Sequence, residues 1–398
     1  MTAESFSVTF VRSAAQIDPV FWESCFGPQV EGRWWYQALE DAGLDEQFSF
    51  LYGVIHSDGI PVGIAPAFLM DFPASRVAPP GLLLVVRWLG RIFPSLVYPK
   101  TLFVGSPCAD EGVIGLLDGV DRRSALLALH RALKAQARAV AAALLIWKDF
   151  PESDAANLER IAEREPLFRL ISFPGTVVEF SSPDKNRYFA ALKGSRRHIL
   201  RKKLRRSKAN VELRVEIVQA PDRQVLDELF GLFRQTYEKA TTRFEKLNRR
   251  FFAILAAQPL AYFIVLKEET SNAMVAFMLC FKLGPKIINK FIGIDYRKPR
   301  EWLLYFRLWD AAVDWALSRG AMSIQSGQTG YAPKIETGHR LVPLFNYCAH
   351  RNQVIHSLAG AFASRIDWST LDDDLARHIR AHPEAISPAP RFDAQSSK

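Results

Sequence analysis

The chain carries one order of predicted elements twice, and this repetition limits its possible folds more than any other feature. In the first half, apolar runs at residues 49–55 and 61–70 flank Ser57-Asp58-Gly59, which is a β-hairpin pattern. A strand is then predicted at 101–105, a helix at 122–142 and a strand at 143–149. The first half therefore reads as hairpin, strand, helix, strand.

The second half repeats this layout with different letters. The expected elements are a hairpin at 261–267 and 273–282, a strand at 286–296, a helix at 301–319 and a strand at 322–326. The length of 398 residues suits two domains of ordinary size. We therefore predict an α/β (α+β) protein with two tandem lobes, each a mixed β-sheet flanked by helices.

The predicted boundaries follow from this layout. An N-terminal lobe is expected at 1–180, a C-terminal lobe at 181–382 and a disordered tail at 383–398. The first lobe alone carries an apolar insertion near 77–97, which Arg87, Arg91 and Pro94 interrupt. Its most membrane-like part, residues 81–97, is too short to cross a bilayer, which takes about 20 residues. A buried helix, a segment at a membrane surface and a cover over an acyl-chain pocket all fit it.

Positive charge is concentrated in one segment of the chain. The net charge is +9, and KGSRRHILRKKLRRSK at 193–208 holds nine basic residues and no acidic one. Without this segment, the basic and acidic residues are equal in number. The segment is expected to begin the second lobe, on a helix starting near Tyr188. The predicted apolar stripe of that helix consists of Phe189, Leu192, Ile199, Leu200 and Leu204.

Two interpretations of this basic helix remain open. It could bind a polyanion, namely tRNA, an anionic membrane surface or an acidic carrier protein, with strong dependence on salt. The candidate contacts are Arg196, Arg197, Arg201, Lys202 and Arg205. Alternatively, it is a solvated helix whose arginines pair with carboxylates of both lobes.

Several kinds of chemistry have no motif in this sequence. The four cysteines are scattered without metal-ligand spacing, so no metal site is predicted and a reducing cytoplasm is expected. The N-terminus lacks the pattern of a signal peptide. No GxSxG, HExxH, P-loop or GxGxxG motif is present. An enzyme of this kind would act mainly by binding and orienting two reactants.

The repeated unit resembles the core of the GNAT acyltransferase fold, and its duplication resembles the FemAB-like branch. Three stretches carry the likeness: Tyr188-Phe189 leading into RRHILRKKLRR, LFRQTYEKATTRFEKLNRRFFAIL at 232–255, and SGQTGYAPKIETGHRLVP at 326–343. The resemblance implies a cytoplasmic N-acyltransferase, with membrane association as an option. It would use acyl-CoA or acyl-carrier protein as cosubstrate and no covalently bound cofactor.

In this reading a small-molecule or cell-envelope amine attacks the acyl group directly, and DNA is not a partner. Two alternatives stay open. One is a Fem-like transferase that uses aminoacyl-tRNA. The other is a non-catalytic adaptor with GNAT-like lobes at a membrane surface.

The resemblance also selects candidate site residues in the stretch after the last predicted strand. Lys334 follows a glycine turn in an expected loop, where a cation could reach a phosphate or a polarised carbonyl. Tyr331 offers a phenol that could orient a substrate or protonate a leaving group. Gln325, Gln328, Gly330 and Gly338 are the further binding candidates in this loop.

Two more groups are candidates by position. Arg297, Lys298 and Arg300 stand where ordinary GNAT enzymes have a pyrophosphate loop, and cations there could hold an anion. Asn289 and Lys290 interrupt an apolar strand, and they need polar partners if they are buried. A binding cleft and an exposed sheet edge both explain this pair.

Overall fold

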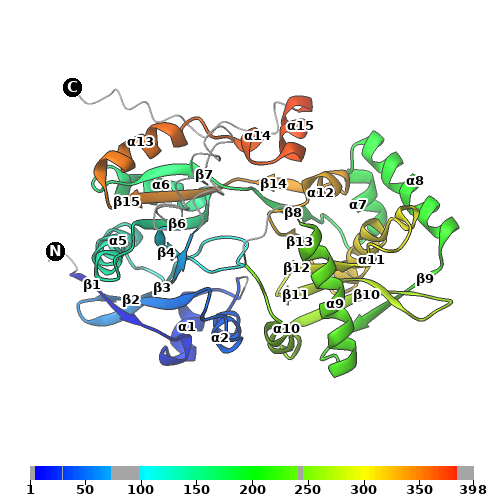
Figure 1. Ribbon diagram of the computed structural model, residues 1–398, viewed down its shortest axis with the longest axis horizontal. Coiled ribbons are helices and arrows are strands. Elements are labelled where there is room, and N and C mark those ends of the chain that lie inside the picture. The colour runs from blue at the N-terminus through cyan, green and yellow to red at the C-terminus, as the bar shows by residue number, and fades with distance from the viewer. Residues whose placement is uncertain (1–4, 29, 73–97, 241–244, 383–398) are drawn as a thin grey trace.

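The computed structural model of the protein describes residues 5–28, 30–72, 98–240 and 245–382 (Figure 1). The insertion predicted near 77–97 and the tail predicted at 383–398 lie outside the described residues. The two predicted hairpins are present. Asp58 and Gly59 both have positive φ, at 49° and 83°, as a tight two-residue hairpin turn requires.

The first sheet contains the first hairpin at one side. Its strand order is β1-β2-β3-β4-β6-β15-β7, with short β5 pairing on β3. The strands are β1 (Phe6–Val11), β2 (Ser49–Ser57), β3 (Ile60–Asp71), β4 (Lys100–Val104), β5 (Gly115–Leu116), β6 (Leu144–Pro151), β7 (Phe168–Ile171) and β15 (Leu344–His350). β4 and β6 are parallel and the other pairs are antiparallel, so the sheet is mixed.

The second sheet is built around the second hairpin. Its order is β14-β8-β13-β12-β11-β10-β9. The strands are β8 (Gly175–Glu179), β9 (Leu213–Val218), β10 (Ala261–Glu268), β11 (Met274–Leu283), β12 (Lys286–Ile294), β13 (Ser323–Ser326) and β14 (Arg340–Val342). β12 and β13 form the parallel pair, and their pairing ends at Asn289 and Ser326. Beyond that point β12 continues to Ile294 without β13.

Helices flank both sheets (Figure 1). They are α1 (Pro19–Cys25), α2 (Arg33–Asp41), α5 (Arg122–Ala139), α6 (Glu152–Ala162), α7 (Lys185–Ala191), α8 (Gly194–Asn210), α9 (Arg223–Lys239), α10 (Arg249–Ala256), α11 (Leu304–Ser318), α12 (Tyr331–Glu336), α13 (Gln353–Ala363), α14 (Trp368–Leu371) and α15 (Asp373–Ala381). In the described ranges, no helix has both the length and the apolar character needed to cross a membrane. The predicted fold class, two mixed sheets flanked by helices, is confirmed.

The sheets do not follow the boundary predicted between residues 180 and 181. β8 precedes that boundary but pairs with β13 and β14 in the second sheet. β15 belongs to the second half of the chain but lies between β6 and β7 in the first sheet. The physical reason is that the edges of both sheets need hydrogen-bond partners, and sequence pattern alone does not say which edge a short strand completes.

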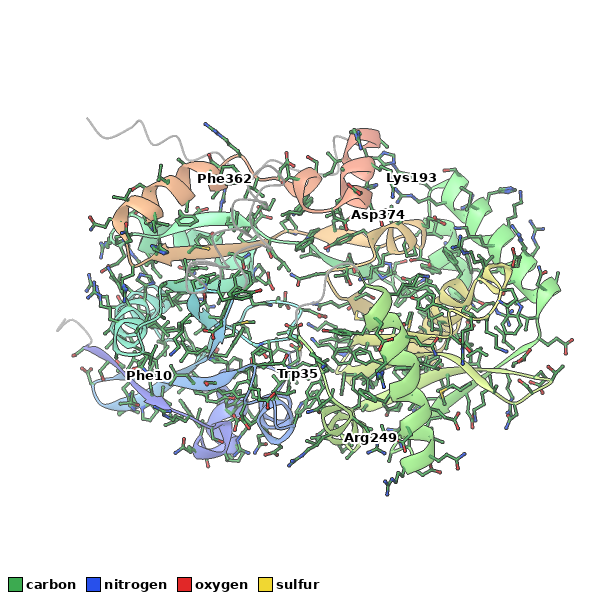
Figure 2. All side chains as sticks on the ribbon, in the orientation of Figure 1. Phe10, Trp35, Lys193, Arg249, Phe362 and Asp374 are labelled. Carbon is green, nitrogen blue, oxygen red and sulfur yellow. The ribbon has the colours of Figure 1, made fainter. Side chains whose placement is uncertain are left out.

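One apolar core joins the two halves. It includes Trp22, Trp35 and Phe68 from the first half together with Phe251 and Phe281 from the second. Trp35 lies between the halves (Figure 2), with its ring 5.6 Å from that of Phe251 and 6.2 Å from that of Phe281. A shared core of large aromatic side chains holds the two sheets in one arrangement.

The basic segment does not lie on one continuous helix starting near Tyr188. Helix α7 ends before Leu192, which is extended at φ −69° and ψ 140°, and α8 begins at Gly194. At the break, the Leu192 side chain is buried and packs against Gly338. On α8, Leu200 and Leu204 form the buried stripe, whereas Ile199, predicted to belong to it, is 45% exposed.

Candidate functional site

A cluster of charged side chains is buried between the two halves of the protein. The Lys290 ammonium lies 2.5 Å from Glu31 Oε1 and 3.2 Å from Asp110 Oδ1. The three side chains are 2%, 8% and 9% exposed, respectively. The ammonium also stands 4.7 Å from the ring centre of Trp35, a favourable cation–π distance.

Three separate elements position this cluster. Lys290 lies on β12, next to the last residue of β12 that pairs with β13. Asp110 lies in the loop after β4, and Glu31 immediately precedes Gly32, the N-cap of α2. Lys290 beside Asn289 was the sequence signal, because a buried lysine requires an acidic partner. The sequence pattern missed Glu31 and Asp110, since nothing local distinguishes them among 42 acidic residues.

The environment separates the proton affinities of the two carboxyl groups. Burial favours neutral Lys290, but the charges of Asp110 and Glu31 outweigh this effect and raise its pKa. Burial would raise the pKa of Glu31, but the attraction and hydrogen bond of Lys290 overcome it and the pKa is lowered. For Asp110, burial prevails and the pKa is raised. Asp110 Oδ2 is buried and has no hydrogen-bond partner.

Lys334 lies close to this cluster. It is on the short helix α12, not in the loop that the sequence suggested, because Gly330 adopts a left-handed conformation and starts the helix. The Lys334 ammonium donates a hydrogen bond to the carbonyl of Gly327. A Cβ atom on Gly327 would stand 3.7 Å from Asp110 Oδ1, so Asp110 lies beside the same turn. Burial lowers the pKa of Lys334 to about 8, although Asp110 opposes this shift.

A hydrogen-bonded chain connects Asn289 to α12. Asn289 Nδ2 and His339 Nε2 lie 3.5 Å and 3.2 Å from Ser326 Oγ. His339 Nδ1 lies 3.0 Å from the carbonyl of Lys334. Burial lowers the pKa of His339 to about 3, and the Lys334 charge adds to the effect. His339 is therefore neutral near pH 7 and links β13 to α12 through hydrogen bonds.

Tyr331 points away from the charged cluster. Its hydroxyl donates to the carbonyl of Pro174 at 2.9 Å, and its ring packs with Trp368 and Leu375. Burial raises its pKa, which disfavours the phenolate. The structure thus gives Tyr331 a role in attaching α12 to the C-terminal helices.

The remaining candidates near α12 shape the backbone. Gly338 has φ 89°, and a Cβ atom there would stand 2.3 Å from Leu192 Cδ2. The Gln328 amide donates to the carbonyl of Phe173 at 3.0 Å and so fixes the turn. Gln325 is half-buried on β13, one residue before Ser326.

The predicted anion site at 297–300 is largely neutralised. Arg297 donates two hydrogen bonds to Asp295, at 2.8 and 2.9 Å. Lys298 pairs with Glu268 at 2.9 Å. Arg300 is exposed, and no carboxylate of the described chain lies within ion-pair distance of it. One free cation at this position is a weak site for a pyrophosphate.

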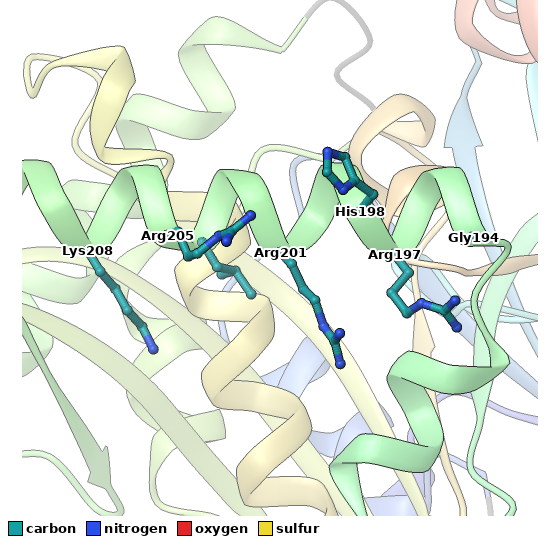
Figure 3. A pocket seen from close by; sticks show the side chains of 7 residues that line it. Gly194, Arg197, His198, Arg201, Arg205 and Lys208 are labelled. Carbon is teal, nitrogen blue, oxygen red and sulfur yellow. The ribbon is translucent and has the colours of Figure 1, made fainter.

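The other predicted group of cations lies along a groove on α8. A groove of about 630 Å³ runs along α8, lined by Gly194, Arg197, His198, Arg201, Leu204, Arg205 and Lys208 (Figure 3). Figure 3 shows Arg197, Arg201 and Lys208 projecting from one side of the helix. Arg196 and Lys202, which the sequence also suggested, are not in this lining.

The alternative interpretation of α8, in which its basic side chains pair with carboxylates, holds for two of them. Among the described residues, Lys203 pairs with Glu336, and Arg206 lies 3.9 Å from Glu301. Within the residues that the structure describes, no carboxylate lies within 4.0 Å of the basic side chains in the groove. Arg201 instead stacks over the Phe189 ring at 5.2 Å. The groove is therefore an uncompensated row of positive charge. Across the described ranges, no three His, Cys, Asp or Glu side chains gather as a metal site would require.

Comparison with known proteins gives a family and a fold. A model of the FemAB-like family, described as peptidoglycan biosynthesis/recognition, matches residues 116–369. The crystal structure of FemX superposes with a TM-score of 0.58 at 12% identity, covering 88% of this chain and 99% of that one. The structure of L-PGS from Bacillus licheniformis superposes with a TM-score of 0.50 at 13% identity, covering 84% of this chain and 97% of that one. At these identities the structural likeness is one of fold. No curated protein matches the sequence.

Proposed function

This chain belongs to the FemAB-like family and is an acyltransferase, and on that premise we propose that its donor is an aminoacyl-tRNA whose phosphates bind along α8. The acceptor in this proposal is an amine of a small molecule or of a cell-envelope precursor. The product is an amide.

The observation that carries the proposal is the row of unpaired cations on α8. From Arg197 to Lys208 this row extends over about 17 Å, at 1.5 Å per helical residue. A compact pyrophosphate would meet only part of such a row, whereas a nucleic-acid backbone presents successive phosphates along it. Arg297 and Lys298 also favour a tRNA donor over a coenzyme. Both are paired with carboxylates, so they would bind the pyrophosphate of a coenzyme only weakly.

Direct contacts connect α7 and α8 to the end of α12. Lys203 on α8 pairs with Glu336 on α12, and the Tyr188 hydroxyl on α7 donates to the carbonyl of Thr337 at 2.7 Å. Helix α12 also carries Lys334. A donor held along α8 would therefore have a short path to the ammonium of Lys334 and to Asp110.

The cluster supplies the groups that aminolysis of an ester needs. In the proposed step, the acceptor nitrogen forms a bond to the acyl carbon and the bond to the ribose oxygen breaks. Asp110, with its unpaired oxygen and raised pKa, accepts the proton that the amine loses. Lys334 stabilises the carbonyl oxygen and gives a proton to the ribose oxygen. Proton transfer from Asp110 to Lys334 then restores both groups.

The cluster is closed in the structure. The side chains of Asp110, Lys290 and Lys334 are all buried, so a substrate can reach them only if the residues that cover them move. A closed site excludes water, which would otherwise hydrolyse the activated ester.

An acyl-carrier protein is the second candidate donor. Its acidic surface would also suit the cations of α8, and its acyl thioester would react with an amine in the same way. Acyl-CoA lacks an extended row of negative charge, so it would contact fewer of the cations on α8.

The experiment supplies the purified full chain with labelled bulk aminoacyl-tRNA, acyl-carrier protein or acyl-CoA, each with a panel of amine acceptors. Formation of labelled amide is measured for wild type, for Arg201→Glu/Arg205→Glu and for the control Arg196→Glu/Lys202→Glu. Both variants change the charge equally, but only the first alters the groove. Transfer from aminoacyl-tRNA that is lost in the groove variant alone supports the proposal. Transfer from acyl-CoA that is equal in all three proteins contradicts it, and no transfer from any donor favours the adaptor alternative.

A further inference from the structure

Helix α13 exposes an apolar stripe to the surroundings. Its 11 residues, QVIHSLAGAFA, contain no Asp, Glu, Lys or Arg, and Ala363 alone among them is buried. Val354 and Leu358 are 69% and 68% exposed, and Ile355 and Phe362 are 43% and 39% exposed. Val354, Leu358 and Phe362 are spaced four residues apart, so they follow one side of the helix.

Contacts on the other side hold the helix in place. The Asn352 side chain accepts hydrogen bonds from the backbone of Val354 and Ile355 and caps the first turn. His356 packs against Phe168 with ring centres 5.1 Å apart, and Gly360 lies against the same phenylalanine. The apolar stripe therefore faces outward as part of an ordered helix, with Phe362 near the outer edge of the molecule (Figure 2). Ordered apolar patches on a surface mark sites of interaction.

Cations lie at both ends of α13. Arg351 precedes α13 and Arg365 follows it, and both are exposed. Beside the start of the helix, a notch of about 120 Å³ is lined by Lys134, Arg138 and Arg351 together with His350 and His356. Lys134 pairs with Glu165 at 2.8 Å. Arg138, Arg351 and Arg365 have no carboxylate of the described chain within ion-pair distance.

We propose that α13 docks the protein on an anionic lipid bilayer, with Val354, Leu358 and Phe362 entering the interfacial layer and Arg138 and Arg351 contacting lipid phosphates. Apolar side chains on one side of a helix with cations beside them are what such a surface binds. A second copy of this chain fits less well, because a symmetric pair would bring the same cations against each other. This inference goes beyond the proposed function and does not depend on it.

The test is flotation of the full chain with two kinds of vesicle, phosphatidylcholine alone and an equal mixture of phosphatidylcholine and phosphatidylglycerol. The apolar variant is Val354→Ser/Leu358→Ser. Its matched control is Val20→Ser/Met322→Ser, which removes two equally exposed apolar side chains elsewhere, at 70% and 64% exposure. The cation variant is Arg138→Ala/Arg351→Ala. All the substituted side chains are exposed, so thermal unfolding should stay unchanged in each protein.

We expect wild type to float with the anionic vesicles. The apolar variant should bind at least about tenfold more weakly, and the matched control should bind like wild type. The cation variant should lose about fivefold in affinity for each arginine removed. Helix α8 could also bind anionic vesicles, so the assay is repeated in an Arg201→Glu/Arg205→Glu background. In that background, the Val354→Ser/Leu358→Ser change should still weaken vesicle binding.

Two results would overturn the proposal. One is equal flotation of wild type and the apolar variant with anionic vesicles. The other is a wild-type dimer that ignores vesicles and becomes monomeric in the apolar variant, as measured by light scattering, because the stripe would then be an interface between copies.

Discussion

Lys290 donates a hydrogen bond to Asp110 at 3.2 Å, and these two residues are 180 positions apart in the chain. The same ammonium contacts Glu31, so one buried cation lies between two buried carboxylates of the other half. The contact forms at the end of the β12–β13 pairing, beside the turn that receives the Lys334 hydrogen bond. The charged cluster and the shared aromatic core together join the two halves.

Replacing Lys290 by Met should destabilise the protein strongly. The change leaves Glu31 and Asp110 buried without their cation, and breaking a buried ion pair in this way costs about 3–5 kcal/mol. The measurement is the free energy of unfolding in urea. A triple variant, Glu31→Gln/Asp110→Asn/Lys290→Met, removes all three charges and should recover most of the loss. A Lys290→Met protein as stable as wild type would refute this account.

Replacing Lys334 by Ala should lower kcat by about 10²–10³ while KM for the donor changes little, because the lost ammonium would stabilise the transition state. Arg in its place should not restore the rate, since a guanidinium is bulkier and does not release a proton. The pKa of Lys334 is lowered to about 8, so the ammonium form is lost as pH rises through that value. The wild-type rate should therefore fall above about pH 8, and a rate that continues to rise would exclude Lys334 as the acid.

The two sides of α8 should differ in their response to salt. Each phosphate contact removed from the groove should lower the slope of log affinity against log salt by about one. Arg201→Ala and Arg205→Ala should do so in tRNA binding measured by filter retention at several salt concentrations. Arg196→Ala and Lys202→Ala, which remove the same charge outside the groove, should leave the slope closer to that of wild type. Identical slopes in all four variants would mean that the groove is not the contact surface.

Gly338→Ala should cost stability through two separate effects. The residue has φ 89°, which a side chain tolerates poorly, at about 1–2 kcal/mol. The new Cβ would also stand 2.3 Å from Leu192 Cδ2 and force repacking, at about 1–3 kcal/mol more. Gly284→Ala is the control, because Gly284 has φ 58° but no atom within 4 Å of the added Cβ. Equal losses of unfolding free energy in the two variants would show that Leu192 is not the obstacle.

His339 should make stability depend on pH in the acid range. Its folded pKa is lowered to about 3 from 6.5, so below pH 6.5 the unfolded chain binds a proton that the folded protein does not. The free energy of unfolding should therefore fall as pH decreases from 6.5 towards 3, by up to about 1.4 kcal/mol per pH unit from this group. His339→Asn should reduce that slope, measured by urea unfolding at several pH values. Equal slopes in wild type and variant would contradict this assignment.

Sequence alone determined the local elements and their repetition. Alternating apolar residues and the Asp58-Gly59 turn specified the first hairpin, and the 3.6-residue period specified α11, because these signals depend on near neighbours. The same reasoning found Lys334, Asn289 and the basic segment as unusual residues. It placed Lys334 in a loop and Tyr331 in the site, because it could not see that Gly330 starts a helix or that Trp368 and Leu375 cover the phenol.

Only the tertiary structure decided which distant residues meet. Glu31 and Asp110 look like ordinary surface acids in the sequence, and they became part of the site when β12 brought Lys290 between them. The exchange of β8 and β15 between the sheets, and the division of α8 into a groove side and an outer side, have the same origin. Each depends on contacts between segments far apart in the chain, which are selected by packing and by the cost of leaving a buried charge or a strand edge without a partner.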